Sequence, residues 1–175
     1  MDGGEESGQT EAMIDRRKFL SQVGAGAAGV LLFGGCSSEA SAARFPVMKS
    51  AEAWRRQLGP ARYHILREGG TEPSYTSPLL NEHRPGTFVC AACANPLYSS
   101  ATKYDSGTGW PSFWRPLPHG IVTQPDAHER YIGNSPTEVL CARCGGHLGH
   151  VFDDGPKPTG LRYCMDGLAL RFVPA

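Results

Sequence analysis

The chain has 175 residues, of which 40% are hydrophobic and 19% are charged, and it carries no formal net charge. That length is sufficient for one domain with its own core and marginal for two. The neutral balance argues against nucleic acid as the main partner, because phosphate binding needs a basic face.

The first 43 residues are predicted to be an export signal and linker. Two adjacent arginines in DRRKFL (residues 15–20) precede a weakly apolar, Gly/Ala-rich stretch over residues 23–35, an order typical of a twin-arginine export signal. The stretch is too short and too rich in glycine to predict a membrane span. The alternative is a disordered acidic tail followed by a small apolar helix. We therefore expect an exported protein, in the periplasm or another extracytoplasmic compartment.

The end of this segment offers two processing sites. LLFGGC ends at Cys36 and resembles a lipoprotein site, although Phe33 stands where that pattern usually has leucine. Lipidation there would tether the domain to a membrane through Cys36. ASA (residues 40–42) offers an ordinary small-residue cleavage site instead. The lipoprotein interpretation is preferred, and with either site the working domain spans residues 44–175.

Two short helices are predicted at the start of this domain. SAEAWRRQL (residues 50–58) begins with Ser50 as N-cap, and GPARYHILREGG (residues 59–70) has proline at its first helical position. After a polar connector, short β-rich runs are separated by Gly, Pro, Asn and Asp: TFVC, IVTQ, TEVLC, HVFDDG, LRYCM and LALRFV. The predicted fold class is therefore mainly β, with short N-terminal helices.

Two similar segments hold four of the six cysteines. FVCAACANPLY (residues 88–98) and VLCARCGGHLG (residues 139–149) each place CxxC after apolar residues, with a leucine four positions further on. A redox dithiol usually needs a helix N-terminus inside a βαβ unit, and disulfides would allow three pairings in an exported protein. The spacing is more typical of zinc knuckles. We therefore predict one structural Zn²⁺ per chain, in a closed tetrahedral site formed by Cys90, Cys93, Cys141 and Cys144.

This assignment leaves Cys164 free. In a strand, residues two apart share a face, so Arg162, Cys164 and Asp166 should point the same way. A guanidinium beside a thiol lowers the pKa of the thiol and favours the nucleophilic thiolate. Beyond Gly167 the apolar positions change parity, so a bulge or bend is expected there. The alternative is an inert buried cysteine, which the charged neighbours disfavour.

Two further segments supply partners for this thiol. HLGHVFDDG (residues 147–155) contributes His147 and His150 as candidate acid/base groups. DSGTGWPSFW (residues 105–114) presents Trp110 after a Gly-x-Gly turn, where it would offer an apolar wall to a methyl-bearing or sulfur-bearing group. The simpler alternatives are structural or surface histidines and a core aromatic.

With these motifs, the chain resembles the methionine-R-sulfoxide reductase B family from about Ser50 to the C-terminus. The shared signatures are REGGTEPSY, the first CxxC, YDSGTGWPSF, CARCGGHLGHVFDDGPKPTGLRYC and ALRF. The resemblance implies two antiparallel sheets in a tent-like arrangement, with zinc bound away from the active site. It also implies these roles: Cys164 as nucleophile, Trp110 holding the substrate's methyl group, His150 and His147 delivering a proton, and Asp154 and Arg162 as supporting polar groups.

The implied activity is reduction of the R epimer of methionine sulfoxide in proteins or peptides. Cys164 would attack the sulfoxide sulfur and become a sulfenic acid. Thr108 stands where many members have a resolving cysteine. We therefore expect regeneration by a thioredoxin-like protein or a small thiol, or by Cys36 if that residue escapes lipidation. Asp166 stands where asparagine is usual, and its carboxylate should raise the pKa of Cys164 unless it pairs with Arg162.

Two other classes of function remain alternatives. A zinc-ribbon binding module would explain the CxxC pairs, but it would leave Cys164 and the two histidines without a role. A Cys-His hydrolase would use Cys164 with His150 and Asp154. Cys164→Ser separates the classes, because it removes either catalytic activity and leaves a binding module intact.

Overall fold

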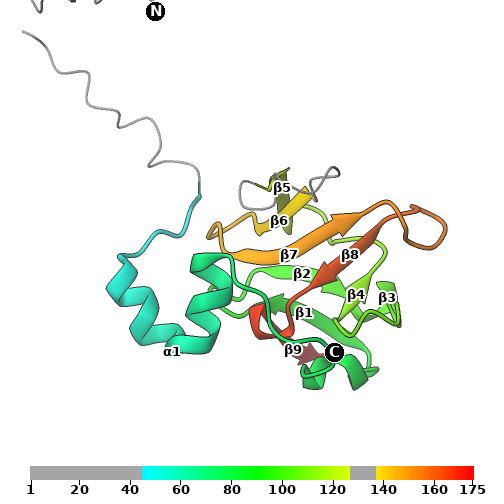
Figure 1. Ribbon diagram of the computed structural model, residues 1–175, viewed down its shortest axis with the longest axis horizontal. Coiled ribbons are helices and arrows are strands. Elements are labelled where there is room, and N and C mark those ends of the chain that lie inside the picture. Colours follow the sequence, from blue (N-terminus) through cyan, green and yellow to red (C-terminus); the bar gives the residue numbers. More distant parts are fainter. Residues whose placement is uncertain (1–44, 127–136) are drawn as a thin grey trace, which may run out of the picture. The chain divides into compact units, whose positions relative to one another are not determined.

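The structure is a computed structural model that describes residues 45–126 and 137–175 (Figure 1). These residues belong to one compact unit, Ser38–Ala175. The predicted export signal and both of its processing sites lie outside the described residues. Within them, no helix combines the length and the apolar character that crossing a membrane requires.

Helix α1 (Ala51–Glu68) precedes the sheets and contains a kink. The side chain of Ser50 caps its first turn by accepting a hydrogen bond from a backbone N–H, as the sequence predicted. Gly59 leaves the helical region with φ 69° and ψ 171°, and Pro60 follows it. The two predicted helices are therefore two segments of one element, joined where the proline cannot continue the hydrogen-bond ladder. The side chains buried from this helix are Trp54, Tyr63, Ile65 and Leu66.

The described strands form two antiparallel sheets, as predicted (Figure 1). The three-stranded sheet has the order β2-β1-β9, comprising β2 (Pro96–Ser99), β1 (Gly86–Cys90) and β9 (Leu170–Pro174). The six-stranded sheet has the order β3-β4-β8-β7-β6-β5, comprising β3 (Lys103–Tyr104), β4 (Ser112–Phe113), β8 (Arg162–Met165), β7 (His147–Phe152), β6 (Thr137–Cys141) and β5 (Ile121–Pro125). Every β-rich run found in the sequence contributes to a strand. The short strands β2, β3 and β4 were not predicted.

The chain crosses from the larger sheet to the smaller one between β8 and β9. A 3-10 helix, η4 (Gly167–Ala169), makes this connection. The bend predicted at Gly167 is therefore a change of sheet, which explains why the apolar positions change parity there. A Cβ atom at Gly167 would clash with the hydroxyl of Ser77.

Aromatic packing fixes the orientation of β8. Tyr98 stacks on Phe113 with ring centroids 4.3 Å apart, and its hydroxyl contacts the sulfur of Met165 at 3.1 Å. Met165 is fully buried in this core. Because neighbouring residues of a strand point to opposite faces, Cys164 is directed away from the core.

Candidate active site

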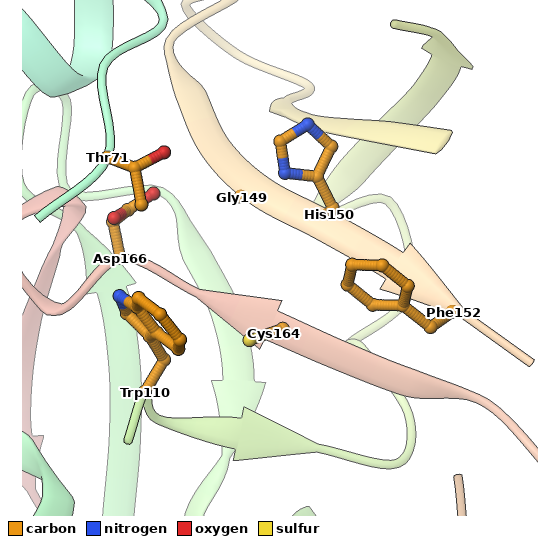
Figure 2. Close-up of a pocket in the computed structure, with 7 residues that line it drawn as sticks. All are labelled: Thr71, Trp110, Gly149, His150, Phe152, Cys164 and Asp166. Atoms are coloured by element: carbon orange, nitrogen blue, oxygen red, sulfur yellow. The ribbon is translucent and has the colours of Figure 1, made fainter. Parts of the chain in front are cut away.

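A cavity of about 160 Å³ lies beside Cys164 (Figure 2). The described residues that line it are Thr71, Trp110, Gly149, His150, Phe152, Cys164 and Asp166. The structure thus brings together four residues that the sequence analysis proposed, Trp110, His150, Cys164 and Asp166, from three separate motifs. Arg162, Asp154 and His147 lie outside this lining.

The register of the larger sheet places the two central side chains next to each other. Cys164 on β8 pairs with His150 on β7 and with Ser112 on β4. Gly149 has φ 138°, and a Cβ atom there would clash with the carbonyl oxygen of Cys164. The close approach of β7 to β8 beside the cavity therefore requires glycine.

Glu72 is a buried residue that the sequence analysis missed, and it organises one side of the cavity. Its carboxylate accepts backbone N–H groups of Gly167 at 2.5 Å and Leu168 at 3.0 Å. Its backbone carbonyl accepts the indole N–H of Trp110 at 3.0 Å, and its backbone N–H donates to Asp166 at 2.9 Å. Glu72 therefore fixes both the Trp110 wall and the turn after β8. Its only signal in the sequence was its place in REGGTEPSY.

The thiol of Cys164 is half-buried, and its pKa lies above the ordinary value. Burial is the main cause, and the charge of Asp166 acts in the same direction. The hydroxyl of Thr108 and the guanidinium of Arg162 favour the thiolate but do not outweigh burial. Arg162 and Asp166 thus act on the thiol in the directions predicted, but burial, which the sequence analysis did not consider, decides the net direction.

Arg162 pairs with Asp154 and not with Asp166. Its Nε and Nη2 atoms each donate to the Asp154 carboxylate at 2.8 Å, in a two-point contact. The guanidinium also lies over the Phe152 ring, 4.2 Å from its centroid. Besides its direct effect on the thiol, Arg162 thus packs against Phe152, which forms part of the cavity wall. The pairing considered between Arg162 and Asp166 does not occur.

The two histidines have different surroundings, each including a carboxylate that the sequence analysis missed. The Nε2 atom of His150, which lines the cavity, is 2.6 Å from the Asp126 carboxylate. His147 is 5% exposed, and its Nδ1 atom is 2.7 Å from Glu138. Burial lowers the pKa of His147. His150 is therefore the histidine placed to exchange a proton with a ligand. The His147 ring packs against the His150 ring, with 5.3 Å between their centroids.

Asp166 is 3% exposed, and burial raises its pKa from 3.8 to about 7. Its Oδ2 atom lies 3.8 Å from Nε2 of His147, a nitrogen with no hydrogen-bond partner among the described residues. Above about pH 7 the carboxylate places a negative charge beside the thiol. This carboxylate is therefore a second titrating group of the cavity, besides the thiol.

Asp166→Asn is expected to lower the pKa of Cys164, because the amide keeps the shape and removes the charge. The rate at which iodoacetamide alkylates Cys164, followed against pH, measures the thiolate directly. Identical thiolate titrations in the two proteins would contradict this placement of the charge.

The same substitution is expected to stabilise the fold, increasingly so as the pH rises. Between 3.8 and about 7, the folded protein retains a proton that the unfolded chain has released. Stability of the natural chain therefore falls as pH rises through this window, and the loss is complete above it. The gain from asparagine should reach a few kcal/mol and be larger at about pH 8 than at about pH 6 in urea unfolding. An equal gain at both values would contradict the raised pKa.

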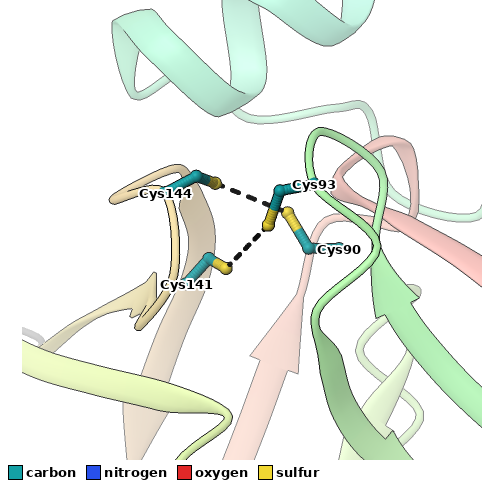
Figure 3. A group of neighbouring side chains, drawn as sticks. All are labelled: Cys90, Cys93, Cys141 and Cys144. Atoms are coloured by element: carbon teal, nitrogen blue, oxygen red, sulfur yellow. Dashed lines mark hydrogen bonds between the residues drawn. The ribbon is translucent and has the colours of Figure 1, made fainter. Parts of the chain in front are cut away.

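The four knuckle cysteines converge on one point, as predicted (Figure 3). Their sulfurs all lie within 4.8 Å of one another, with 3.8 Å between Cys90 and Cys144 and 3.6 Å between Cys93 and Cys141. A tetrahedral ion with metal–sulfur bonds of 2.3 Å would place its ligands about 3.8 Å apart. The donor set therefore fits such an ion, and none of these cysteines lines the cavity.

Both knuckles have the same backbone geometry. The backbone N–H of Cys90 donates to the carbonyl of the fifth residue after it, and the backbone carbonyl of Cys90 accepts from the N–H of the fourth residue after it. Cys141 makes the same two hydrogen bonds. The fourth residue after each has positive φ, 58° at Ala94 and 65° at Gly145. Cys90 ends a strand of the smaller sheet and Cys141 a strand of the larger one. An ion bound here would thus connect the two sheets.

Comparison with known proteins agrees with this geometry. The SelR domain model matches residues 58–174. The peptide methionine sulfoxide reductase MsrB of Leptospira interrogans is 52% identical over 129 residues, which cover 73% of this chain and 96% of the relative. The proteins of the same name from Agrobacterium fabrum and Bradyrhizobium diazoefficiens are each 52% identical, over 73% of this chain and 93% and 91% of their own lengths.

Proposed function

Because the chain belongs to the methionine-R-sulfoxide reductase B family, we propose that it reduces the R epimer of methionine sulfoxide in peptides or proteins, with Cys164 as nucleophile. The observation that carries this proposal is the separation of the cysteines. Four cysteines (Cys90, Cys93, Cys141 and Cys144) converge on one candidate metal site, which we call the metal cluster. The fifth described cysteine lies in a cavity with Trp110 and His150.

The chemistry requires a sulfur nucleophile and a proton for the departing oxygen. The Cys164 thiolate attacks the electrophilic sulfoxide sulfur while the oxygen takes up a proton, for which His150 is the nearest cavity-lining histidine. The oxygen then passes from the methionine sulfur to the Cys164 sulfur as the bond between the two sulfurs breaks. Methionine leaves and Cys164 becomes a sulfenic acid, so the sulfoxide gains two electrons and the cysteine loses two. The Asp126 carboxylate orients the imidazole for this transfer.

Trp110 supplies the apolar wall against which the substrate's methyl group packs. Its indole N–H is bound to Glu72, so the ring is held by its edge. A sulfoxide is chiral at sulfur, so one fixed position for the methyl group and another for the oxygen select a single epimer. This arrangement supports selection of one epimer, and the proposal that this is the R form rests on membership of the family.

Regeneration falls to an external thiol. Thr108 lies 3.8 Å from the Cys164 sulfur and has no thiol to offer, and the other four described cysteines form the metal cluster. A thioredoxin-like protein or a small thiol condenses with the sulfenic acid to a mixed disulfide and water, and a second thiol then releases Cys164. Cys36 takes the first role only if it is not lipidated.

The metal in this proposal is a structural Zn²⁺ bound by Cys90, Cys93, Cys141 and Cys144. When bound, it supplies a closed cross-link and no open position for substrate. The four sulfurs themselves argue for a cation, because they lie within 4.8 Å of one another and three of the four cysteines are buried.

We place this activity outside the cytoplasm. The twin arginines of DRRKFL, the apolar stretch after them and the candidate lipidation site at Cys36 support export and tethering to a membrane. The matched residues cover 96% of the Leptospira relative and 73% of this chain. This chain therefore has residues outside the part that it shares with that relative.

The test is incubation of the metal-loaded protein with dithiothreitol and a peptide that carries either pure epimer of methionine sulfoxide. We expect methionine from the R epimer and none above background from the S epimer. Equal turnover of both epimers would contradict the proposed selectivity. Turnover of an ester or amide, without sulfoxide reduction, would support the Cys-His hydrolase, and no turnover of either would leave the binding module.

A further inference from the structure

Three hydroxyl groups connect the cavity thiol to a backbone carbonyl. Thr108 Oγ1 lies 3.8 Å from the sulfur of Cys164 and 2.8 Å from Ser106 Oγ. Ser106 Oγ lies 2.7 Å from Ser112 Oγ, which donates to the carbonyl of Trp110 at 3.1 Å. Ser112 is fully buried and pairs with Cys164 across β4 and β8. We call these three residues, Thr108, Ser106 and Ser112, the hydroxyl chain.

The carbonyl at one end sets the direction of the protons in this chain. A carbonyl oxygen only accepts, and each hydroxyl has a single proton to donate. Ser112 donates to Trp110, so Ser106 donates to Ser112, and Thr108 donates to Ser106. The oxygen of Thr108 then faces Cys164 as an acceptor for the neutral thiol. In this order the hydroxyl chain favours the thiol, and Thr108 favours the thiolate only when its own proton points at the sulfur.

We propose that the hydroxyl chain reverses when Cys164 ionises, with Thr108 as the positioning residue that donates to the thiolate. In the reversed order Thr108 donates to the sulfur, Ser106 to Thr108, and Ser112 to Ser106. Only rotations about C–O bonds are needed. The carbonyl of Trp110 loses its hydroxyl partner, which a stronger bond to a charged sulfur offsets. The inference rests on the proposed function in that it concerns the thiol which that function uses as nucleophile.

Other charged groups also face this thiol and contribute to its titration. Arg162 lies on its own strand, Asp166 directly after that strand, His150 on β7 and Tyr104 on β3. None of them is altered by substitutions in the hydroxyl chain. The contribution of the hydroxyl chain to the pKa of Cys164 is therefore measured as a difference between variants in which these other groups are unchanged.

The test measures alkylation of Cys164 by iodoacetamide against pH in the full, metal-loaded chain, with the modified residue identified by mass spectrometry. Thr108→Val removes the donor, so alkylation near neutral pH should fall about tenfold, whereas the rate for the fully ionised thiol should stay unchanged. Ser112→Ala removes the anchor at the carbonyl, so reversal no longer costs a hydrogen bond. Alkylation near neutral pH should then rise several-fold.

Opposite signs for these two variants are the signature of reversal, because a general loosening of the cavity would move both rates in one direction. Thr108→Ser keeps the donor and should match the natural chain, as should Thr123→Val, the same change on the exposed part of β5. If Ser112→Ala fails to fold, Ser106→Ala also frees Thr108 and should show the same rise. Equal profiles for Thr108→Val and the natural chain, or shifts of the same sign in both variants, would overturn the proposal. Alkylation needs no sulfoxide, so this outcome is independent of the proposed activity.

Discussion

Cys164→Ser is expected to lower the rate of methionine sulfoxide reduction on the order of 10⁶-fold, in the range found when an enzyme loses its nucleophile. A serine hydroxyl ionises far less readily than a thiol and does not form the sulfenic acid on which oxygen transfer depends. Because Cys164 is only half-buried and points away from the core, the same substitution should leave the unfolding midpoint and the metal content nearly unchanged. Single-turnover formation of methionine, without added thiol, measures the step that Cys164 performs.

Cys36→Ser is the matched control, since it makes the same chemical change outside the described domain. It should leave single-turnover oxygen transfer at the natural rate. Methionine formed by Cys164→Ser at close to the natural rate would assign the chemistry to another group. A loss of activity accompanied by loss of metal would show that Cys164 acts as a metal ligand.

The convergence of the four cysteines and the position of the central thiol were predictable because their signals are local. Two CxxC segments with the same flanking pattern predict the same turn, and both turns show the same hydrogen bonds. The alternation of Arg162, Cys164 and Asp166 along one strand likewise needs no knowledge of the fold. The change of parity at Gly167 was visible for the same reason, although not that it marks a crossing between sheets.

The supporting carboxylates were not predictable, because their roles depend on strand register and on contacts that only the folded chain makes. Glu72 reaches the turn that follows β8, some 95 residues later, and Glu138 reaches His147 across two strands whose register is interrupted. Apart from its place in REGGTEPSY, nothing in the local sequence distinguishes Glu72 from Glu82, which pairs with Arg84. The net direction of the Cys164 pKa was missed because burial, its largest cause, is a property of the assembled cavity.

Removal of the metal is expected to unfold the described domain. A structural zinc contributes on the order of 10 kcal/mol to folding, comparable with the whole stability of a typical domain, about 5–15 kcal/mol. The cluster joins the last residue of β1 to the last residue of β6, and so connects the two sheets. Helix α1 also depends on these loops, because Arg67 donates to the carbonyl of Cys144 at 2.9 Å and Gln57 to that of Ala92 at 2.7 Å.

Cys93→Ser tests this role without a chelator. Cys93 is the least buried of the four ligands, so a serine there meets little steric resistance, and the main loss is one thiolate. Metal content should fall to a small fraction of one ion per chain, and the far-UV circular dichroism of the sheets should be lost at temperatures at which Cys164→Ser remains folded. The two substitutions thus give reciprocal results, one removing the chemistry and keeping the metal, the other removing the metal and with it the fold. A Cys93→Ser protein that stays folded and reduces sulfoxide at the natural rate without metal would mean that packing between the two sheets, and not the ion, holds the domain together.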